Sequence, residues 1–488
     1  MEYRYNLQEP GDFSLSNVYL YSYRQGGGDG PYGIEIKSLI SEINIFESIS
    51  AKAITGNIVL ADGYDVVEDL PLTGLERIEF TFSTPSVISN TRYDFTSTRG
   101  SPMYIYKIEN RKRINQSAQV YVLHFCSKEM YFNEKLRVNQ SFSGTTNDIV
   151  RQLVKERDFL NSKKKLFIEP SKTLNKYVFP NKRPYEAIQM MADESLSKKY
   201  NDSDYLFFEN KQGIHFRSYE SLIAYNGTRT RMPQESFYVE SGSVRGGGGN
   251  NPVNAAMRRI RNYEVINQFD TLLHMRGGAF ANELITTDFF NKTINTHTYN
   301  YFEEFPKHFH LASDKDGGKS DNGHLLPATP SDEFNKGLEQ YPSKRFVYSN
   351  TDKLHNDFVR PDFKSIIRQR EAQKQLVNMI ALRVEVAGNT TIDAGDVIYL
   401  EIPQVKAEPR GKDLFLSGNY VVRHLRHNIS IIGNKHYTTI ECTRDSVSTT
   451  YPSGLDDNTF IGRERNFESQ PSEGIYNIYD LEESENLS

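Results

Sequence analysis

The 488-residue sequence contains no tryptophan and only two cysteines, Cys126 and Cys442. Two cysteines cannot supply a disulfide framework or a cysteine-based zinc site, so we expect a cytosolic history with buried, unreactive thiols. The lack of tryptophan argues mildly against a carbohydrate-binding cleft, where stacked aromatic rings usually include it.

A strong excess of one charge is also missing. The formal net charge is -5 and the isoelectric point is near 6.2, which leaves no general basic surface. A protein held on nucleic acid by phosphate contacts is therefore not expected. The two short basic runs are predicted to be solvated: residues 111–113 cap a hairpin loop, and residues 163–165 lie between two elements.

Long apolar runs and familiar catalytic motifs are absent as well. No run approaches the roughly 20 apolar residues of a membrane span, and the N-terminus has no apolar core of signal-peptide length. The chain contains no G-x-S-x-G, H-E-x-x-H, Walker or paired C-x-x-C pattern. We predict no catalytic, cofactor-binding or metal-ligating residues, and no cofactor.

What the sequence does contain is alternation. Between Ile34 and Ser127, apolar and polar residues alternate, as in Ile43, Asn44 and Ile45. This pattern predicts strands packed on a core from one side, forming a small antiparallel barrel or sandwich. Helical patterns begin at Thr145, with the spacing of a capping box, and at Pro184. Alternation returns after a helix that begins at Phe363.

These changes of pattern divide the chain. The predicted fold class is β-rich α+β, with two antiparallel β-barrels and small α+β domains between and inserted. The predicted parts are a barrel at 1–137, an α+β domain at 138–235, a second barrel at 236–301 plus 376–450, an inserted loop-rich domain with a helix at 302–375, and an acidic flexible tail at 451–488.

The two β regions match in order, which indicates an internal repeat. In each, a glycine precedes a strand, a second strand follows, and a tyrosine stands five residues before a cysteine: Tyr121 before Cys126, and Tyr437 before Cys442. The alternative is two unrelated β domains that both alternate.

Two clusters could hold a metal or act as a catalytic site. The segment 55–80 has five carboxylates, Asp62, Asp65, Glu68, Asp69 and Glu76, around an Asp-Gly turn, but it misses the calcium-loop pattern, so a turn is preferred. The second is a loop with His308, His310, Asp314, Asp316, Asp321 and His324. Its Gly, Ser and Lys content favours an exposed loop over a metal site. His424 and His427 are out of phase on one strand, so they are not expected to share a ligand.

The order of parts resembles the baseplate central hub protein of contractile-tailed phages, which is related to the late control protein D and the head of the VgrG spike. The resemblance rests on TGNIVLADGYDVVEDLPLTGLERIEF, RPYEAIQMMADES, YLFFENKQGIHFRS, DAGDVIYLEIP, LSGNYVVRHLRHNI and HYTTIECTRD. It implies tail-tube-like barrels and a homotrimer. The six barrels of the trimer would face a sixfold tube, and its three chains would match the threefold symmetry of a spike.

The resemblance therefore implies a structural, non-enzymatic virion protein of the tail baseplate, assembled in the host cytoplasm. Its expected partners are its own copies, the tail tube protein, the central spike protein, baseplate wedge proteins, and genomic DNA that passes through the lumen without specific binding. Two alternatives stay open: a tail-associated cell-wall or polysaccharide hydrolase using carboxylates such as Asp62 and Asp65, and a host-receptor-binding tail protein.

Overall fold

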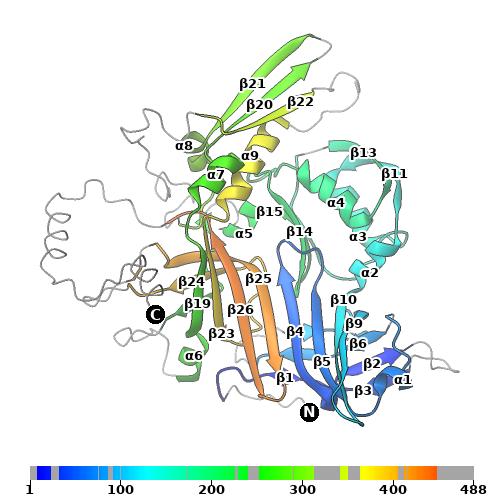
Figure 1. Cartoon of the computed structure of the whole chain (residues 1–488). Helices are drawn as coiled ribbons and strands as arrows, with labels where there is room; N and C mark the ends of the chain where they lie inside the picture. The colour runs from blue at the N-terminus through cyan, green and yellow to red at the C-terminus, as the bar shows by residue number, and fades with distance from the viewer. Residues whose placement is uncertain are drawn as a thin grey trace, which may run out of the picture. The chain divides into compact units, whose positions relative to one another are not determined.

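The computed structural model describes residues 8–22, 32–74, 76–85, 92–98, 100–172, 174–225, 229–239, 252–288, 291–312, 341–349, 363–404, 412–413 and 415–447. Strands dominate this part of the chain and helices are short, so the fold is β-rich α+β, as predicted (Figure 1). The predicted acidic tail lies outside the described residues, and so does most of the loop with four of the candidate ligands.

The first β unit is built from residues before Lys128. Its apolar alternation buries one face of each strand in a single core that includes Ile43, Ile45, Ile58 and Phe125. Its strands and short helices are β1 (Ser14–Leu15), β2 (Tyr19–Ser22), β3 (Tyr32–Glu35), η1 (Lys37–Leu39), β4 (Ile40–Ser48), β5 (Thr55–Asp62), α1 (Val66–Asp69), β6 (Arg77–Glu79), β7 (Thr81–Ser83), β8 (Tyr93–Asp94), β9 (Met103–Arg113) and β10 (Gln119–Ser127).

The α+β unit that follows has its own core, centred on apolar residues of α3, α4 and the β14–β15 hairpin. The predicted cap of α3 is confirmed, because the Thr145 side chain accepts a hydrogen bond from the Asp148 amide at 3.3 Å. Its elements are α2 (Lys128–Lys135), β11 (Val138–Thr145), α3 (Thr146–Lys155), β12 (Leu166–Ile168), β13 (Leu174–Lys182), α4 (Pro184–Asp193), β14 (Tyr205–Asn210), β15 (Gly213–Ser218), α5 (Tyr219–Ile223), β16 (Ala224–Tyr225) and β17 (Arg229–Thr230).

The second β unit forms around a third core that includes Leu382, Ile398, Val422 and Ile440. Its elements are β18 (Glu235–Tyr238), α6 (Pro252–Met257), β19 (Ile260–Asn267), β23 (Ile380–Ala387), β24 (Val397–Glu401), β25 (Gly418–Ser430) and β26 (Lys435–Arg444).

The inserted unit begins earlier in the chain than predicted. The sequence assigned residues up to 301 to the second barrel, but β20 pairs with β21 and β22 in a separate three-stranded sheet. This sheet shares a core with α7 and α9, shown beside it in Figure 1. Alternation alone cannot say which sheet a strand joins. The elements are α7 (Thr271–Gly277), β20 (Ala281–Asp288), β21 (Thr293–Asn300), α8 (Tyr301–Glu304), η2 (Phe305–Lys307), β22 (Lys344–Ser349) and α9 (Phe363–Leu376).

The two β units repeat one pattern of strand pairing. Neighbours follow the order β6, β9, β10, β5, β4 in the first unit and β24, β25, β26, β23, β19 in the second. Equivalent strands also carry bulges at equivalent places: Tyr106 in β9 and Arg423 in β25 have no partner, and neither do Ser41 in β4 and Arg261 in β19. A bulge bends and twists a strand, so both units curve alike at these two places. Further register shifts, in β9 near residue 110 and in β19 near residue 266, have no counterpart in β25 or β4.

The repeat predicted from the sequence is thus supported, but its cysteine match was wrong by one residue. Pairing aligns Cys442 with Phe125, since they face Val422 and Ile105 beside the shared bulge, and it aligns Cys126 with Thr443. Both thiols are buried, as expected. Burial raises the pKa of Cys126 to about 12 and raises that of Cys442 as well, so both stay protonated and unreactive at neutral pH.

Candidate functional site: the junction of the two β units

The two β units are joined edge to edge by β4 and β25. These strands pair antiparallel over seven residue pairs, from His424 opposite Ser48 to Ser430 opposite Glu42, so one sheet runs through both units (Figure 1). Ile429 of β25 belongs to the core of the first unit. The junction therefore combines a hydrogen-bonded ladder with an apolar contact that crosses it.

Polar side chains on the other face of this ladder bind across it. Asn428 Nδ2 donates to Asn44 Oδ1 at 2.9 Å and to Glu42 Oε1 at 2.6 Å. Arg426 Nε also donates to Asn44 Oδ1 at 2.9 Å. Cross-strand pairs of this kind fix the register in which two strands meet.

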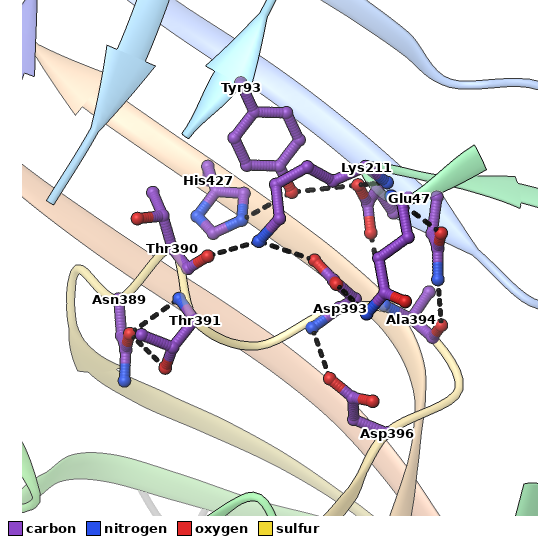
Figure 2. Close-up of polar contacts among 12 residues, drawn as sticks. Glu47, Tyr93, Lys211, Asn389, Thr390, Thr391, Asp393, Ala394, Asp396 and His427 are labelled. Carbon is purple, nitrogen blue, oxygen red and sulfur yellow. Dashed lines mark hydrogen bonds and ion pairs between the residues drawn. The ribbon is translucent and has the colours of Figure 1, made fainter. Parts of the chain in front are cut away.

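Glu47, at the end of β4, is the centre of a buried polar cluster (Figure 2). Its side chain accepts hydrogen bonds from the Tyr93 hydroxyl at 2.9 Å, the Lys211 amide at 2.7 Å and the Ala394 amide at 3.1 Å. Burial, reinforced by the nearby Asp393 carboxylate, raises the Glu47 pKa to about 8.

Lys211 supplies the cation of this cluster. It comes from the β14–β15 turn of the α+β unit, and its Nζ lies 2.8 Å from Asp393 Oδ1 in the loop before β24. The same Nζ donates to the Thr390 carbonyl and stands 5.3 Å from the centre of the Tyr93 ring. Asp396, whose carboxylate accepts from the Asp393 amide at 2.9 Å, has its pKa raised to about 6 by burial and by Asp393.

Two histidines of the second β unit, one in β25 and one in β26, complete the cluster next to Tyr93. His427 Nε2 lies 3.0 Å from the Tyr93 hydroxyl, and His427 Nδ1 lies 3.0 Å from His436 Nε2. Burial lowers the pKa of both rings, that of His436 to about 3, so both are neutral at pH 7. A neutral ring can donate from one nitrogen and accept at the other, which suits this chain of contacts.

The cluster thus ties together three parts of the chain that are distant in sequence. Glu47 and Tyr93 belong to the first β unit, Lys211 to the α+β unit, and Asp393 and His427 to the second β unit. Glu47, Tyr93, Asp393 and His427 are each at most 2% exposed. Side chains buried this deeply do not contact solvent or a ligand from solvent. Their role in this structure is to hold the three units together.

Asp62 and Glu76 of segment 55–80 lie in turns, as predicted, whereas Glu68 and Asp69 belong to the short helix α1, which Asp65 precedes. Asp62 accepts hydrogen bonds from the Tyr64 and Val66 amides, both at 2.9 Å, and from the Tyr121 hydroxyl at 3.0 Å. Glu76 accepts from the amides of Thr73 at 2.7 Å and Gly74 at 2.8 Å. These bonds explain both acids without a metal.

The prediction of a solvated loop was wrong for His308 and His310, which are buried. His308 Nδ1 lies 2.6 Å from Glu220, and His310 Nδ1 lies 2.6 Å from Asp445. They are drawn inward because their neighbours Phe309 and Leu311 insert into a fourth core. Asp314, Asp316, Asp321 and His324 lie outside the described residues. Within the described part of the chain, no group of three or more potential metal ligands comes together.

The two basic runs have different outcomes. Residues 111–113 end β9 and are exposed, and Arg113 donates to the loop carbonyls of Asn115 at 3.1 Å and Gln116 at 2.6 Å, so this run caps a hairpin loop as predicted. Lys164 is not solvated: its Nζ lies 2.7 Å from Glu129 and 2.5 Å from Glu209, both buried. Burial disfavours its charge, yet these two carboxylates raise the Lys164 pKa. His424 is half-buried while His427 is buried, in keeping with their predicted phase.

Sequence reasoning missed the Glu47 cluster. One signal was available: Glu47 follows Ile43 and Ile45 at a spacing of two, so it falls on the face of β4 that should be apolar. An acid there predicts a buried polar partner. Its partners Lys211 and Asp393 are far away in the sequence, and no local pattern identifies them.

Comparisons with known proteins point to phage tails. No protein-family model matches the chain. A curated relative, the "Probable baseplate hub protein gp334" of Vibrio phage KVP40, is 22% identical over 426 residues, covering 85% of this chain and 92% of the relative. The resemblance to baseplate hub proteins that was inferred from the sequence is confirmed by this relative.

Solved structures give weaker similarities. A tail protein from Neisseria meningitidis MC58 covers 89% of this chain and 97% of its own, at 10% identity and a TM-score of 0.46. The 43 kDa tail protein of prophage MuSo2 from Shewanella oneidensis covers 88% and 98%, at 9% identity and a TM-score of 0.46. None of the helices in the described ranges is long and apolar enough to cross a membrane.

Proposed function

We propose that this chain is a structural hub protein of a contractile phage tail baseplate, and that three copies close into a ring. The ring would join a sixfold tail tube to a threefold central spike, contact baseplate wedge proteins at its rim, and let the genome pass through its lumen. The name and coverage of the Vibrio phage relative support the first part of this proposal.

The observation that carries the proposal is the duplicated β unit. Two units with the same strand order and with bulges at two equivalent places are joined edge to edge within one chain. Three such chains present six similar units to a sixfold partner while keeping threefold symmetry for another. The buried Glu47 cluster supports this role, because it holds both units and the α+β unit in a fixed relation.

Of the two carboxylates named for a hydrolase, Asp65 is exposed and accepts a hydrogen bond from Gln119 Nε2 at 2.9 Å, and Asp62 is taken up by the fold. The Asp62 carboxylate is buried and is bound by backbone amides and a hydroxyl, so it is engaged in a turn. No described feature favours a receptor-binding role. We therefore propose no catalytic activity for this chain, and we place it in the virion baseplate after assembly in the host cytoplasm.

Light scattering tests the proposal on the purified chain, alone and mixed with the tube and spike proteins of the same phage. The expected species has a mass of three times 56.1 kDa, and binding to both partners should add mass to that trimer. A chain that stays monomeric in every mixture, or that binds neither partner, would overturn the proposal.

A further inference from the structure

The turn between β14 and β15, residues 209–212, lies where the two β units part. At this end of the β4–β25 ladder, the Ile49 amide donates to the Arg423 carbonyl at 3.0 Å, and earlier residues of β25 pair with β24 instead. The Lys211 amide of the turn donates to Glu47, near the end of β4, at 2.7 Å. A turn of the α+β unit therefore occupies the fork of the sheet that runs through both β units (Figure 2).

One side of this turn binds the first β unit. Glu209 Oε2 accepts hydrogen bonds from Ser127 Oγ at 2.8 Å and from the Ile54 amide at 3.4 Å. The other oxygen of Glu209 lies 2.5 Å from Lys164 Nζ, so the buried carboxylate has a cation within its own unit. This side of the turn is thus held to the end of β10 and to the segment that joins β4 to β5.

The other side of the turn binds the second β unit. Asn210 Nδ2 donates to the Ala394 carbonyl at 3.1 Å, and Gln212 Nε2 donates to Asp393 Oδ2 at 2.7 Å. Lys211 Nζ lies 2.8 Å from the second oxygen of Asp393. Three consecutive side chains of the turn therefore bind the one loop that joins β23 to β24.

Apolar packing supports the turn from behind. Phe208, which is fully buried in β14, belongs to a core that also contains Ile49 of the first β unit. The same core includes Val397 and Val421 of the second β unit, and Leu222 of α5. The hairpin that carries the turn is therefore packed against both β units and is not free to shift relative to either one.

The β4–β25 ladder alone leaves one degree of freedom between the units. Its seven residue pairs fix the register. The rotation between neighbouring strands, however, ranges from roughly −10 to −35° among sheets. A turn that is bound to both units at the fork restricts this rotation, because a change in rotation would lengthen the hydrogen bonds on one side of the turn.

We propose that residues 209–212 act as a brace that sets the rotation between the two β units. This inference rests on the proposed ring. Six similar units fit a sixfold partner only when the rotation between the two units of one chain matches the rotation between neighbouring chains. The α+β unit, through this turn, thereby determines whether three chains can close.

Pulsed electron resonance on the full chain measures the rotation. Spin labels on Glu68→Cys in α1 and Asn254→Cys in α6 occupy exposed positions of the two β units, and the buried native cysteines should not react. Labelled chains are mixed with an excess of unlabelled chains, so that only distances within one chain are recorded. The original turn should give a single narrow distribution of distances.

The test variant combines Lys211→Ala, Gln212→Ala and Asp393→Asn. It removes the contacts of the turn with the β23–β24 loop and leaves no buried carboxylate without its cation. The distance distribution should broaden or shift, and electron microscopy should find fewer closed rings. The control combines Lys163→Ala, Gln152→Ala and Asp158→Asn, which are the same changes at exposed positions of the α+β unit, and should match the original chain.

The outcomes separate the brace from the ring. An unchanged distance distribution in the test variant, with circular dichroism showing that it is folded, would overturn the brace and leave the hub proposal standing. If the test variant does not fold, Gln212→Ala alone decides, because it removes one hydrogen bond and no charge, and an unchanged distribution there would overturn the brace. An original chain that forms no ring would overturn the hub proposal, while the distances still test the brace.

Discussion

Removing the positive charge of Lys211 should destabilise the Glu47 cluster, which holds the two β units and the α+β unit together. Lys211 is 9% exposed in its side chain and its ion-pair partner Asp393 is 2% exposed, so both charges are shielded from water. In Lys211→Met, the Asp393 carboxylate keeps its burial but loses the cation at 2.8 Å, and Glu47 and Asp396 lie close by. Breaking a buried pair by removing one partner typically costs about 3–5 kcal/mol.

Hydrogen exchange measures this loss where it occurs. Because the chain has several cores, hydrogen exchange locates an effect that a global unfolding curve reports only for the whole chain. The amides of Lys211 and Ala394 donate to Glu47, and their protection reports local opening of the cluster. A loss of about 3–5 kcal/mol corresponds to protection reduced by at least about a hundredfold, since 1.4 kcal/mol is tenfold.

Two further variants make this prediction decisive. Asp393→Asn in the Lys211→Met background should recover much of the protection, because the stranded charge is gone. Lys163→Met makes the same chemical change at an exposed lysine and should stay within about 0.5 kcal/mol of the original chain. A loss of protection below about tenfold in Lys211→Met would refute the role assigned to this ion pair.

Three other perturbations have defined outcomes. The Glu47 pKa is raised from 4.5 to about 8, so the folded chain binds the proton more tightly than the unfolded chain, and stability should fall as pH rises through that range. Calorimetry should find a smaller dependence of stability on pH in Glu47→Gln. An unchanged dependence would contradict the assignment. Ile429→Ala should lower the free energy of unfolding in urea by about 2–5 kcal/mol, because the Ile429 side chain packs into the core of the first β unit across the junction. The control Ile432→Ala, at an 82% exposed position, should leave the free energy of unfolding nearly unchanged. Equal effects would contradict the contribution of Ile429 to the junction. Burial disfavours the charged form of His310, but Asp445 raises the His310 pKa above 6.5. His310→Gln should therefore lower Tm most at pH below 6.5, and the difference in Tm should shrink as pH rises through the folded-state pKa. A difference in Tm that grows with pH would contradict the ion pair.

Local patterns predicted the elements of this fold well. Alternation identified β4, β5, β10, β25 and β26, and the capping spacing at Thr145 identified the start of α3. The order of these elements was enough to suggest the repeat and the resemblance to baseplate hub proteins. Each of these inferences uses residues close together in the sequence, where periodicity and turn chemistry are strong.

The remaining features depend on contacts between distant residues. Alternation could not assign β20 and β21 to the inserted sheet, because that choice depends on pairing with β22. Loop composition suggested that His308 is solvated, but Glu220 lies 88 residues away and binds it in a buried site. Lys164 was misjudged for the same reason. The match of the cysteines failed because strand pairing sets the register, and it aligns Cys442 with Phe125 although both cysteines follow a tyrosine by five residues.

The ring of three chains is the central claim, and electron microscopy of the purified chain tests it most directly. Views down the symmetry axis should show a threefold ring with six similar lobes, two from each chain. Images of single two-lobed particles, or of rings with another symmetry, would contradict the account.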